Sequence, residues 1–228
     1  YALLATAAHY ANRYFQQKAE DRLMAEEHKA HEALRFISQD MMRFLREKTL
    51  LRQIARRLVS TLHISHAAIY LAEGENGHYR RKTTWYHPPR KDTDLPEVLP
   101  ADSTLAKDLV TVRIPRVKEE LKLHQQALSG NWREMTRNLD ALQASVVIPT
   151  FHQRRFLGFL VLGEKRSARI WTQDDLNLLM VLANQASLAI ENARFHEAEE
   201  KRQAQIAETA KLTSLGVMAS SIGHQFNN

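Results

Sequence analysis

The fold class is decided by residues 145–163, SVVIPTFHQRRFLGFLVLG. The apolar runs 145–149 and 156–163 each have the length and composition of a buried strand, and the polar segment 152–155 between them has the composition of a turn. Two strands joined by so short a connection run antiparallel. The stretch therefore predicts a hairpin within an antiparallel sheet.

Upstream of this hairpin the pattern is one of short strands and turns. Three further strands are expected over 67–71, 79–85 and 111–114, and a short helix is expected over 104–110. A helical insert follows over 117–142. Successive antiparallel strands with helices on one side predict an α+β sheet domain.

A long helix is expected downstream of the hairpin. Thr172 has the position of an N-terminal cap, with Asp175 three residues later, as in a capping box. Apolar residues then recur at helical spacing, and no Pro or Gly occurs before Gly216. A continuous helix over 174–222 would be on the order of 75 Å long, at about 1.5 Å per residue. It is therefore expected to begin inside the sheet domain and to leave it.

The first 62 residues contain no Pro or Gly and are rich in helix formers, which predicts an N-terminal signalling helix. A heptad seam can be drawn near its end through Ile37, Met41, Phe44, Lys48, Leu51, Ala55, Leu58 and Leu62. The seam favours a parallel coiled-coil homodimer. The alternative is a single helix that packs its apolar stripe on the following domain, and one helix can do both along its length.

The composition excludes several kinds of site. The 228 residues include no Cys, which excludes disulfides, thiolate metal sites, a cysteine nucleophile and thioether-attached chromophores. The formal net charge is +6, but the basic residues form scattered short clusters without interleaved aromatic residues, so we expect no nucleic-acid partner. His28 and His31 have helical spacing, but without further ligands they indicate a solvated face, and we expect no metal site.

Both ends of the sequence indicate a longer parent protein. Residues 1–8, YALLATAA, begin without Met and are followed by Arg13 and Lys18, as at the cytoplasmic end of a last membrane helix. An ordinary amphipathic helix start is the alternative. Residues 227–228 lie in a helical pattern that has no terminating signal. We therefore expect a cytoplasmic segment of a parent associated with the inner membrane, with any membrane tether upstream of Tyr1.

The second half of the sheet region resembles GAF domains. The resemblance is carried by SVVIP (145–149), LGFLVLG (157–163), WTQDDL (171–176) and LANQASLAIENAR (182–194). It covers about residues 63–194 and is weaker in the first half. It implies a sheet of five or six antiparallel strands with helices on one face and a ligand-sized cavity on the other.

Four side chains are candidates for the lining of that cavity: Tyr70, Trp85, Trp132 and Met135. They could equally be core residues. The cyclic-nucleotide signature of the family is missing, and bilin attachment needs a Cys, so the resemblance implies no cofactor. A small-molecule ligand stays open.

The C-terminal segment 212–228, LTSLGVMASSIGHQFNN, resembles the phospho-acceptor helix of histidine kinases. By that match His224 is the phospho-acceptor, and Asn228 has the position that places water for dephosphorylation of the regulator. A neutral imidazole is a competent nucleophile near pH 7 and would form a phosphoramidate with the γ-phosphoryl group of ATP. The residue after the His is normally acidic in this family. Here it is Gln225, which lacks the charge that stabilises the imidazole as the phosphoryl group arrives.

The resemblances divide the chain into an N-terminal signalling helix (1–62), a GAF sensor domain (63–194), and a linker leading into the dimerisation and phospho-acceptor helix (195–228). They imply the sensory and phospho-acceptor segment of a bacterial two-component sensor histidine kinase, with a response regulator as partner. The chain has no Gly-rich ATP-lid motif. ATP and Mg therefore belong to a kinase domain of the full-length protein, and the segment alone should be inactive. The alternative is a non-catalytic GAF dimer that binds a small ligand or only relays a conformational change.

Overall fold

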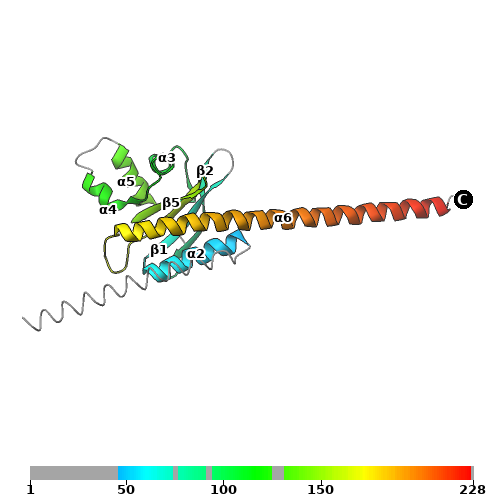
Figure 1. Ribbon diagram of the computed structural model, residues 1–228, viewed down its shortest axis with the longest axis horizontal. Helices are drawn as coiled ribbons and strands as arrows, with labels where there is room; N and C mark the ends of the chain where they lie inside the picture. Colours follow the sequence, from blue (N-terminus) through cyan, green and yellow to red (C-terminus); the bar gives the residue numbers. More distant parts are fainter. Residues whose placement is uncertain (1–45, 74–76, 91–93, 125–130, 227–228) are drawn as a thin grey trace, which may run out of the picture.

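The computed structural model of the chain describes residues 46–73, 77–90, 94–124 and 131–226. Within these residues the strands form one antiparallel sheet of six strands in the order β3-β2-β1-β6-β5-β4 (Figure 1). The strands are β1 (His66–Glu73), β2 (His78–Tyr86), β3 (Val98–Leu99), β4 (Arg116–Val117), β5 (Val146–His152) and β6 (Arg155–Leu162). The expected α+β class and the expected strand number are confirmed.

The hairpin predicted from residues 145–163 lies at the centre of the sheet. Val146 of β5 pairs with Leu162 of β6, and β6 pairs on its other side with β1. The turn contains Gln153, whose φ of 54° is in the left-handed region that tight hairpin turns require. Because helices pack on both faces of the sheet, the side chains of both strands are buried on both faces, which explains their nearly continuous apolar runs.

Helices cover both faces of the sheet, not one face as expected. α2 (Glu47–Leu62) and α6 (Gln173–Phe226) pack on one face, and α3 (Thr104–Val112), α4 (Lys118–His124) and α5 (Asn131–Ala141) lie on the other. Each interface has its own hydrophobic core. The face on which the resemblance implied a cavity is therefore covered by α3, α4 and α5.

The apolar stripe of α2 packs on the sheet, which is the alternative to a coiled coil. Leu51, Ala55 and Leu58 from the heptad seam are buried in the same core as Ile69 of β1. The seam residue Lys48 is exposed, and the earlier seam positions 37–44 lie outside the described residues. α2 therefore packs as part of the sheet domain, although the sequence predicts that this domain begins at residue 63.

The prediction of a strand over 111–114 is wrong. Helix α3 continues to Val112 and ends at Arg113, whose φ of 61° closes the helix in a left-handed cap. The strand that follows is only Arg116–Val117, which pairs with the start of β5. The β-branched Thr111 and Val112 suggested a strand, but the buried Leu105 and Leu109 hold this segment as the last turn of a helix.

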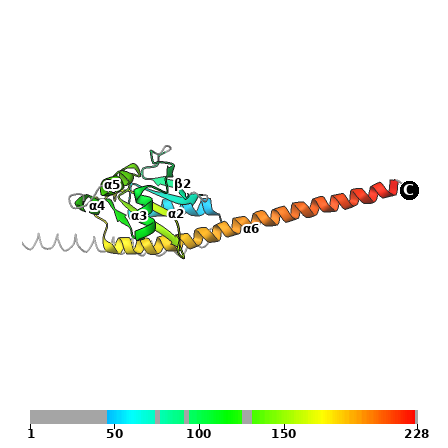
Figure 2. The ribbon, with the colours of Figure 1, turned by 90° about the horizontal axis from the view of Figure 1, so that it is seen from above.

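The predicted long helix is confirmed and runs without interruption from Gln173 to Phe226. Its buried face against the sheet ends at Ala193, and every residue over 201–216 is exposed. Figures 1 and 2 show α6 leaving the domain and extending well beyond it. Among the described helices, α6 included, none is long and apolar enough to cross a membrane.

Candidate functional site

The start of α6 is fixed to the sheet domain by a reciprocal cap. The Asp175 N–H donates to the Thr172 hydroxyl at 3.2 Å, and the Thr172 N–H donates to the Asp175 carboxylate at 3.0 Å. This is the capping box that the sequence predicts. Two of the backbone N–H groups at the helix start that lack helical partners are satisfied in this way.

Lys165 and Trp171 complete the anchor at this end. The Lys165 ammonium donates to the Asp175 carboxylate at 2.6 Å and lies 4.6 Å from the centroid of the Trp171 ring. The Trp171 indole N–H donates to the Ser145 hydroxyl at 2.9 Å, which joins the segment before α6 to the segment before β5. The side chain of Asp175 is only 10% exposed. Burial acts to raise its pKa, but the hydrogen bonds from Lys165 and from the Thr172 N–H outweigh burial and lower the pKa below its usual value.

A second anchor lies where α6 leaves the domain. The Arg194 guanidinium donates to the Glu47 carboxylate of α2 at 2.5 Å and lies 3.5 Å from Glu191. The backbone N–H of Glu47, which has no partner within α2, donates to the Glu197 carboxylate of α6 at 3.0 Å. Burial acts to lower the pKa of Arg194, but the hydrogen bond and charge of Glu47 raise it overall. The first residue of α2 therefore holds α6 through both its side chain and its backbone.

This junction could not be found from the sequence. Arg194 belongs to the family-like run AIENAR, but its partner Glu47 is 147 residues away in the chain. An acidic residue in the first turn of a helix is expected for the helix dipole alone. Only the packing of α2 beside α6 on the same face of the sheet brings the two side chains together.

Three of the four candidate cavity residues lie together, in the core between the sheet and the α3–α5 side. Tyr70 is fully buried and stacks on Phe159, with ring centroids 4.9 Å apart, and its hydroxyl donates to the Pro96 carbonyl at 2.6 Å. Burial raises the pKa of Tyr70 far above its ordinary value. Met135 is buried in the same cluster, and Trp132 packs against it partly exposed. These contacts make Tyr70 and Met135 core residues in this structure.

Trp85 does not join the other three, because it lies on the opposite face of the sheet against α2. The reason is a bulge in β2. Thr83 pairs with Ile69 while Arg81 pairs with Tyr70, so Lys82 is an extra residue in the strand. Tyr79 and Trp85, six residues apart, would share a face in a regular strand, and the bulge places them on opposite faces.

The outward face of α6 carries a second, apolar feature. Val181, Leu188 and Phe195 recur every seven residues and are 52%, 43% and 69% exposed. Val181 and Leu188 lie on the part of α6 whose opposite face is buried against the sheet, and Phe195 lies just beyond the end of that part at Ala193. Seven-residue spacing of exposed apolar side chains is the pattern of a helix that pairs with another helix.

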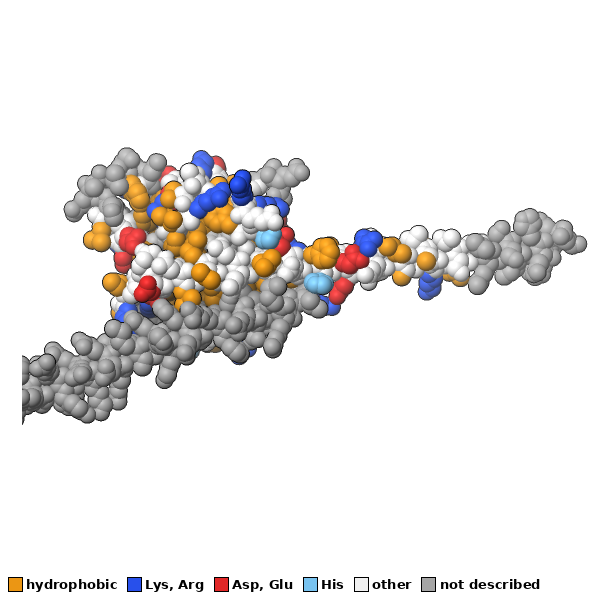
Figure 3. Space-filling model, viewed as in Figure 1, with side chains coloured by type: hydrophobic (Ala, Val, Ile, Leu, Met, Phe, Trp, Pro, Cys, Tyr) orange, Lys and Arg blue, Asp and Glu red, His pale blue; other side chains and the backbone are white. Residues whose placement is uncertain are grey.

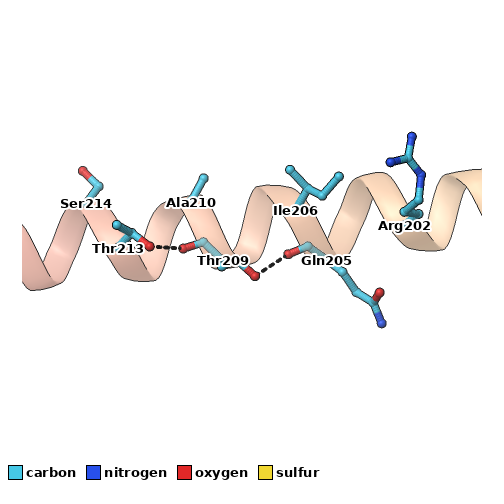
Figure 4. A pocket seen from close by; sticks show the side chains of 7 residues that line it. All are labelled: Arg202, Gln205, Ile206, Thr209, Ala210, Thr213 and Ser214. Carbon is cyan, nitrogen blue, oxygen red and sulfur yellow. Dashed lines mark hydrogen bonds between the residues drawn. The ribbon is translucent and has the colours of Figure 1, made fainter.

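Beyond the domain, the residues of α6 over 201–216 are exposed. A shallow hollow of about 680 Å³ is lined by residues of one stretch of the helix, Arg202 to Ser214 (Figure 4). The hydroxyls of Thr209 and Thr213 donate to the carbonyls one turn earlier, both at 2.9 Å, as exposed Thr residues in helices commonly do. In Figure 3 charged and apolar side chains alternate along this extension, which stands clear of the domain.

The proposed phospho-acceptor segment lies at the far end of α6. The backbone of residues 224 and 225 is helical, but the side chains of His224 and Gln225 lie outside the described part, and Asn228 lies outside the described residues altogether. In the part of the chain that the structure describes, no three His, Asp or Glu side chains are grouped so as to hold a metal ion.

Comparison with known proteins gives one family and many similar folds. A family model described as GAF domain matches residues 46–190, a range that includes α2. A methyl-accepting chemotaxis protein fragment is similar over 70% of this chain and 97% of its own length, with 19% identity and a TM-score of 0.55. The phycocyanobilin-bound GAF domain of a cyanobacterial phytochrome is similar over 73% of this chain and 96% of its own length, with 18% identity and a TM-score of 0.56.

The GAF domain of an Acinetobacter phosphoenolpyruvate-protein phosphotransferase is similar over 72% of this chain and 93% of its own length, with 16% identity and a TM-score of 0.53. No curated protein matches the chain. At these identities the structural likeness shows a shared fold and does not transfer a ligand.

Proposed function

The chain belongs to the GAF domain family, and on that premise we propose that it is the sensory and phospho-acceptor segment of a two-component sensor histidine kinase. In this proposal the GAF domain receives a signal and α6 carries it to His224. In the full-length protein, His224 accepts the phosphoryl group of ATP from an ATP-binding kinase domain that also binds Mg. The phosphoryl group then passes to a response regulator.

The observation that carries the proposal is the continuity of α6. One helix is capped at Thr172, packs on the sheet to Ala193 and continues to Phe226. His224 is 30 residues beyond Arg194, which corresponds to about 45 Å of helix at about 1.5 Å per residue. A rotation or shift of α6 at the domain would therefore move the acceptor segment as part of the same rod.

In this proposal, the Glu47–Arg194 junction is the contact through which a displacement of α2 reaches α6. α2 and α6 lie side by side on one face of the sheet, and the junction connects the N-terminal end of α2 to the exit point of α6 (Figure 1). A displacement of α2, or of the strands on which it packs, would reach α6 at the residue where the helix becomes exposed. In a parent tethered to the inner membrane, α2 would also receive a signal from upstream.

We further propose that two chains pair in parallel through α6. Val181, Leu188 and Phe195 form an exposed apolar stripe at seven-residue intervals. The same stripe of a second chain would pack against it in a symmetric dimer. A parallel pair would bring two acceptor helices together beyond the domain, where 201–216 is exposed in the single chain.

The acceptor chemistry rests on the match of 212–228 to the phospho-acceptor helix. The Gln225 amide oxygen can accept a hydrogen bond from the imidazole N–H and so hold the tautomer that presents the other nitrogen. It lacks the negative charge of the usual acidic residue. Hydrogen bonds to charged groups contribute about 1.5–3 kcal/mol, against about 0.5–1.5 kcal/mol for neutral ones. A difference of roughly 1–1.5 kcal/mol corresponds to a transfer that is slower by about tenfold.

The test is autophosphorylation of the full-length parent with radiolabelled ATP and Mg. We expect slow labelling that His224→Ala abolishes and that Gln225→Glu accelerates several-fold, up to about tenfold. A rate that Gln225→Glu leaves unchanged or lowers would contradict the role given to this position. Labelling that survives His224→Ala would contradict the acceptor assignment.

The alternative function is a GAF dimer that binds a small ligand or relays a conformational change without chemistry of its own. The feature that favours it is Gln225 in the position of the usual acidic residue. A full-length parent that is not labelled with either Gln or Glu at this position, while still forming the dimer, would support this alternative.

A further inference from the structure

The outer face of α2 carries a row of cations beside a tryptophan. Lys48, Arg52 and Arg56 are exposed and four residues apart, so they share one face of the helix. Together with Thr49, Gln53 and Trp85 of β2 they line a hollow of about 400 Å³. This volume is within the range of small-molecule sites in proteins. We call this hollow the α2 basic hollow.

Two of the cations lie over the ring of Trp85. The guanidinium carbons of Arg52 and Arg56 lie 5.6 Å and 5.7 Å from the centroid of its ring, so both make cation–π contacts with one side chain. These two carbons can therefore be no more than about 11 Å apart. The Trp85 ring itself packs against the core under α2, so it is a fixed element of the site.

The charges in the hollow are not neutralised within the described part of the chain. No carboxylate there forms an ion pair with Lys48, Arg52 or Arg56, whereas Arg80, Arg116 and Arg194 each pair with an acidic side chain. The neighbouring carboxylate of Glu47 is engaged by Arg194. Like charges within about 11 Å of one another repel, and a bound anion would reduce that repulsion.

We propose that the α2 basic hollow binds a phosphate-bearing anion. The planar guanidinium of each Arg presents paired N–H donors that match phosphate oxygens, and Lys48 adds a third positive charge. Thr49 and Gln53 supply neutral donors on the same face of α2. The site lies on the face of the sheet opposite to Tyr70, Trp132 and Met135, so it is separate from any cavity on the α3–α5 side.

The position of the hollow gives binding a consequence for α6. Lys48 directly follows Glu47, which holds Arg194 at the exit of α6. An anion drawn to Lys48 and Arg52 would place negative charge within one turn of the Glu47–Arg194 junction. The proposal itself concerns binding and does not depend on kinase activity.

The test is isothermal titration of the 228-residue chain with inorganic pyrophosphate at 0.15 M salt. We expect saturable binding of one pyrophosphate per chain that weakens at least about tenfold in the double variant Arg52→Gln/Arg56→Gln, since each position loses a charge-assisted contact. The control is Lys201→Gln/Arg202→Gln, which removes the same two charges from the exposed part of α6 and should leave binding unchanged. All three proteins should have the same circular dichroism, because the four substituted side chains are exposed.

A second arm distinguishes a soluble phosphate compound from a lipid headgroup. Co-sedimentation with phosphatidic acid vesicles, and with phosphatidylcholine vesicles as the blank, is measured for the same proteins. If the chain binds phosphatidic acid vesicles but not pyrophosphate, and only the Arg52/Arg56 variant loses vesicle binding, the anion is a lipid headgroup. If the chain binds pyrophosphate, the anion is a soluble compound. The proposal would be overturned if the two double variants lost equal amounts of binding affinity, or if the unsubstituted chain bound neither pyrophosphate nor phosphatidic acid vesicles.

Discussion

The contact between Glu47 and Arg194 should be measurable as a coupling free energy. The two side chains are 19% and 32% exposed, and the distance between the Arg194 Nε and the Glu47 Oε2 is 2.5 Å. Exposed ion pairs contribute about 0.2–1 kcal/mol, and breaking a deeply buried pair costs about 3–5 kcal/mol. For this half-buried pair we expect a coupling free energy of about 1.5 kcal/mol, after allowance for screening by solvent.

The assay is a double-mutant cycle with Glu47→Gln, Arg194→Met and the double variant. Urea unfolding followed by tryptophan fluorescence reports on the domain, because Trp85 and Trp171 both pack in its core. In thermal unfolding of the same proteins, a single substitution should lower the melting temperature by about 3–6 °C, given about 2–4 °C per kcal/mol for a chain of this size. Glu47→Gln leaves the backbone hydrogen bond to Glu197 in place, so the cycle isolates the side-chain pair.

The matched control is the cycle of Glu199→Gln and Arg202→Met. This pair also joins an Arg to a Glu, with a contact of 2.8 Å, but its members are three residues apart on α6 beyond the domain and its side chains are 33% and 64% exposed. Its coupling free energy should be no more than about 0.5 kcal/mol. A Glu47–Arg194 coupling free energy that does not exceed that of the control would show that this ion pair does not hold α6 to α2.

Two further predictions concern the start of α6 and its outer face. Asp175→Asn should lower the free energy of unfolding by about 2 kcal/mol at pH 7, since the neutral amide loses the buried charge-assisted contact with Lys165. Because the folded pKa of Asp175 lies below its ordinary value of 3.8, its contribution is complete above that value and is lost as the pH falls through the folded pKa. Urea titrations should therefore show the two proteins converging below about pH 4, and a constant difference down to pH 2 would contradict this. Leu188→Gln/Phe195→Gln should shift the chain from dimer to monomer in light scattering, whereas Ile170→Gln, at a still more exposed apolar position outside α6, should not. An unsubstituted chain that is monomeric, or equal behaviour of both variants, would contradict pairing through α6.

The local features of the fold could be predicted because their signals are local. The hairpin follows from two apolar runs and a polar turn within nineteen residues, 145–163. The start of α6 follows from the spacing of Thr172 and Asp175, whose hydrogen bonds the structure contains. The length of α6 follows from the absence of Pro and Gly before Gly216, which itself lies in the helix.

The features that depend on distant partners could not be predicted. The stripe of α2 is compatible with a coiled coil and with packing on the sheet, and only the tertiary structure shows that Leu51 and Leu58 lie in the domain core. The face on which Trp85 lies depends on a single extra residue, Lys82, in β2. No spacing rule indicates that bulge, which places Trp85 beside Arg52 and Arg56 and not beside Tyr70.

In the proposed function, α6 carries a signal as one helix from the GAF domain to His224. The most direct test of this transmission is the insertion of two or of seven helix-forming residues after Ala204 in the full-length parent. Two residues rotate the acceptor segment by about 200° relative to the domain, and seven residues rotate it by only about 20°. The initial rate of His224 labelling from ATP, with His224→Ala as the blank, should change at least about fivefold with two residues and stay near the parent rate with seven. Equal rates for both insertions, whether unchanged or equally lost, would contradict transmission through the rotational register of α6.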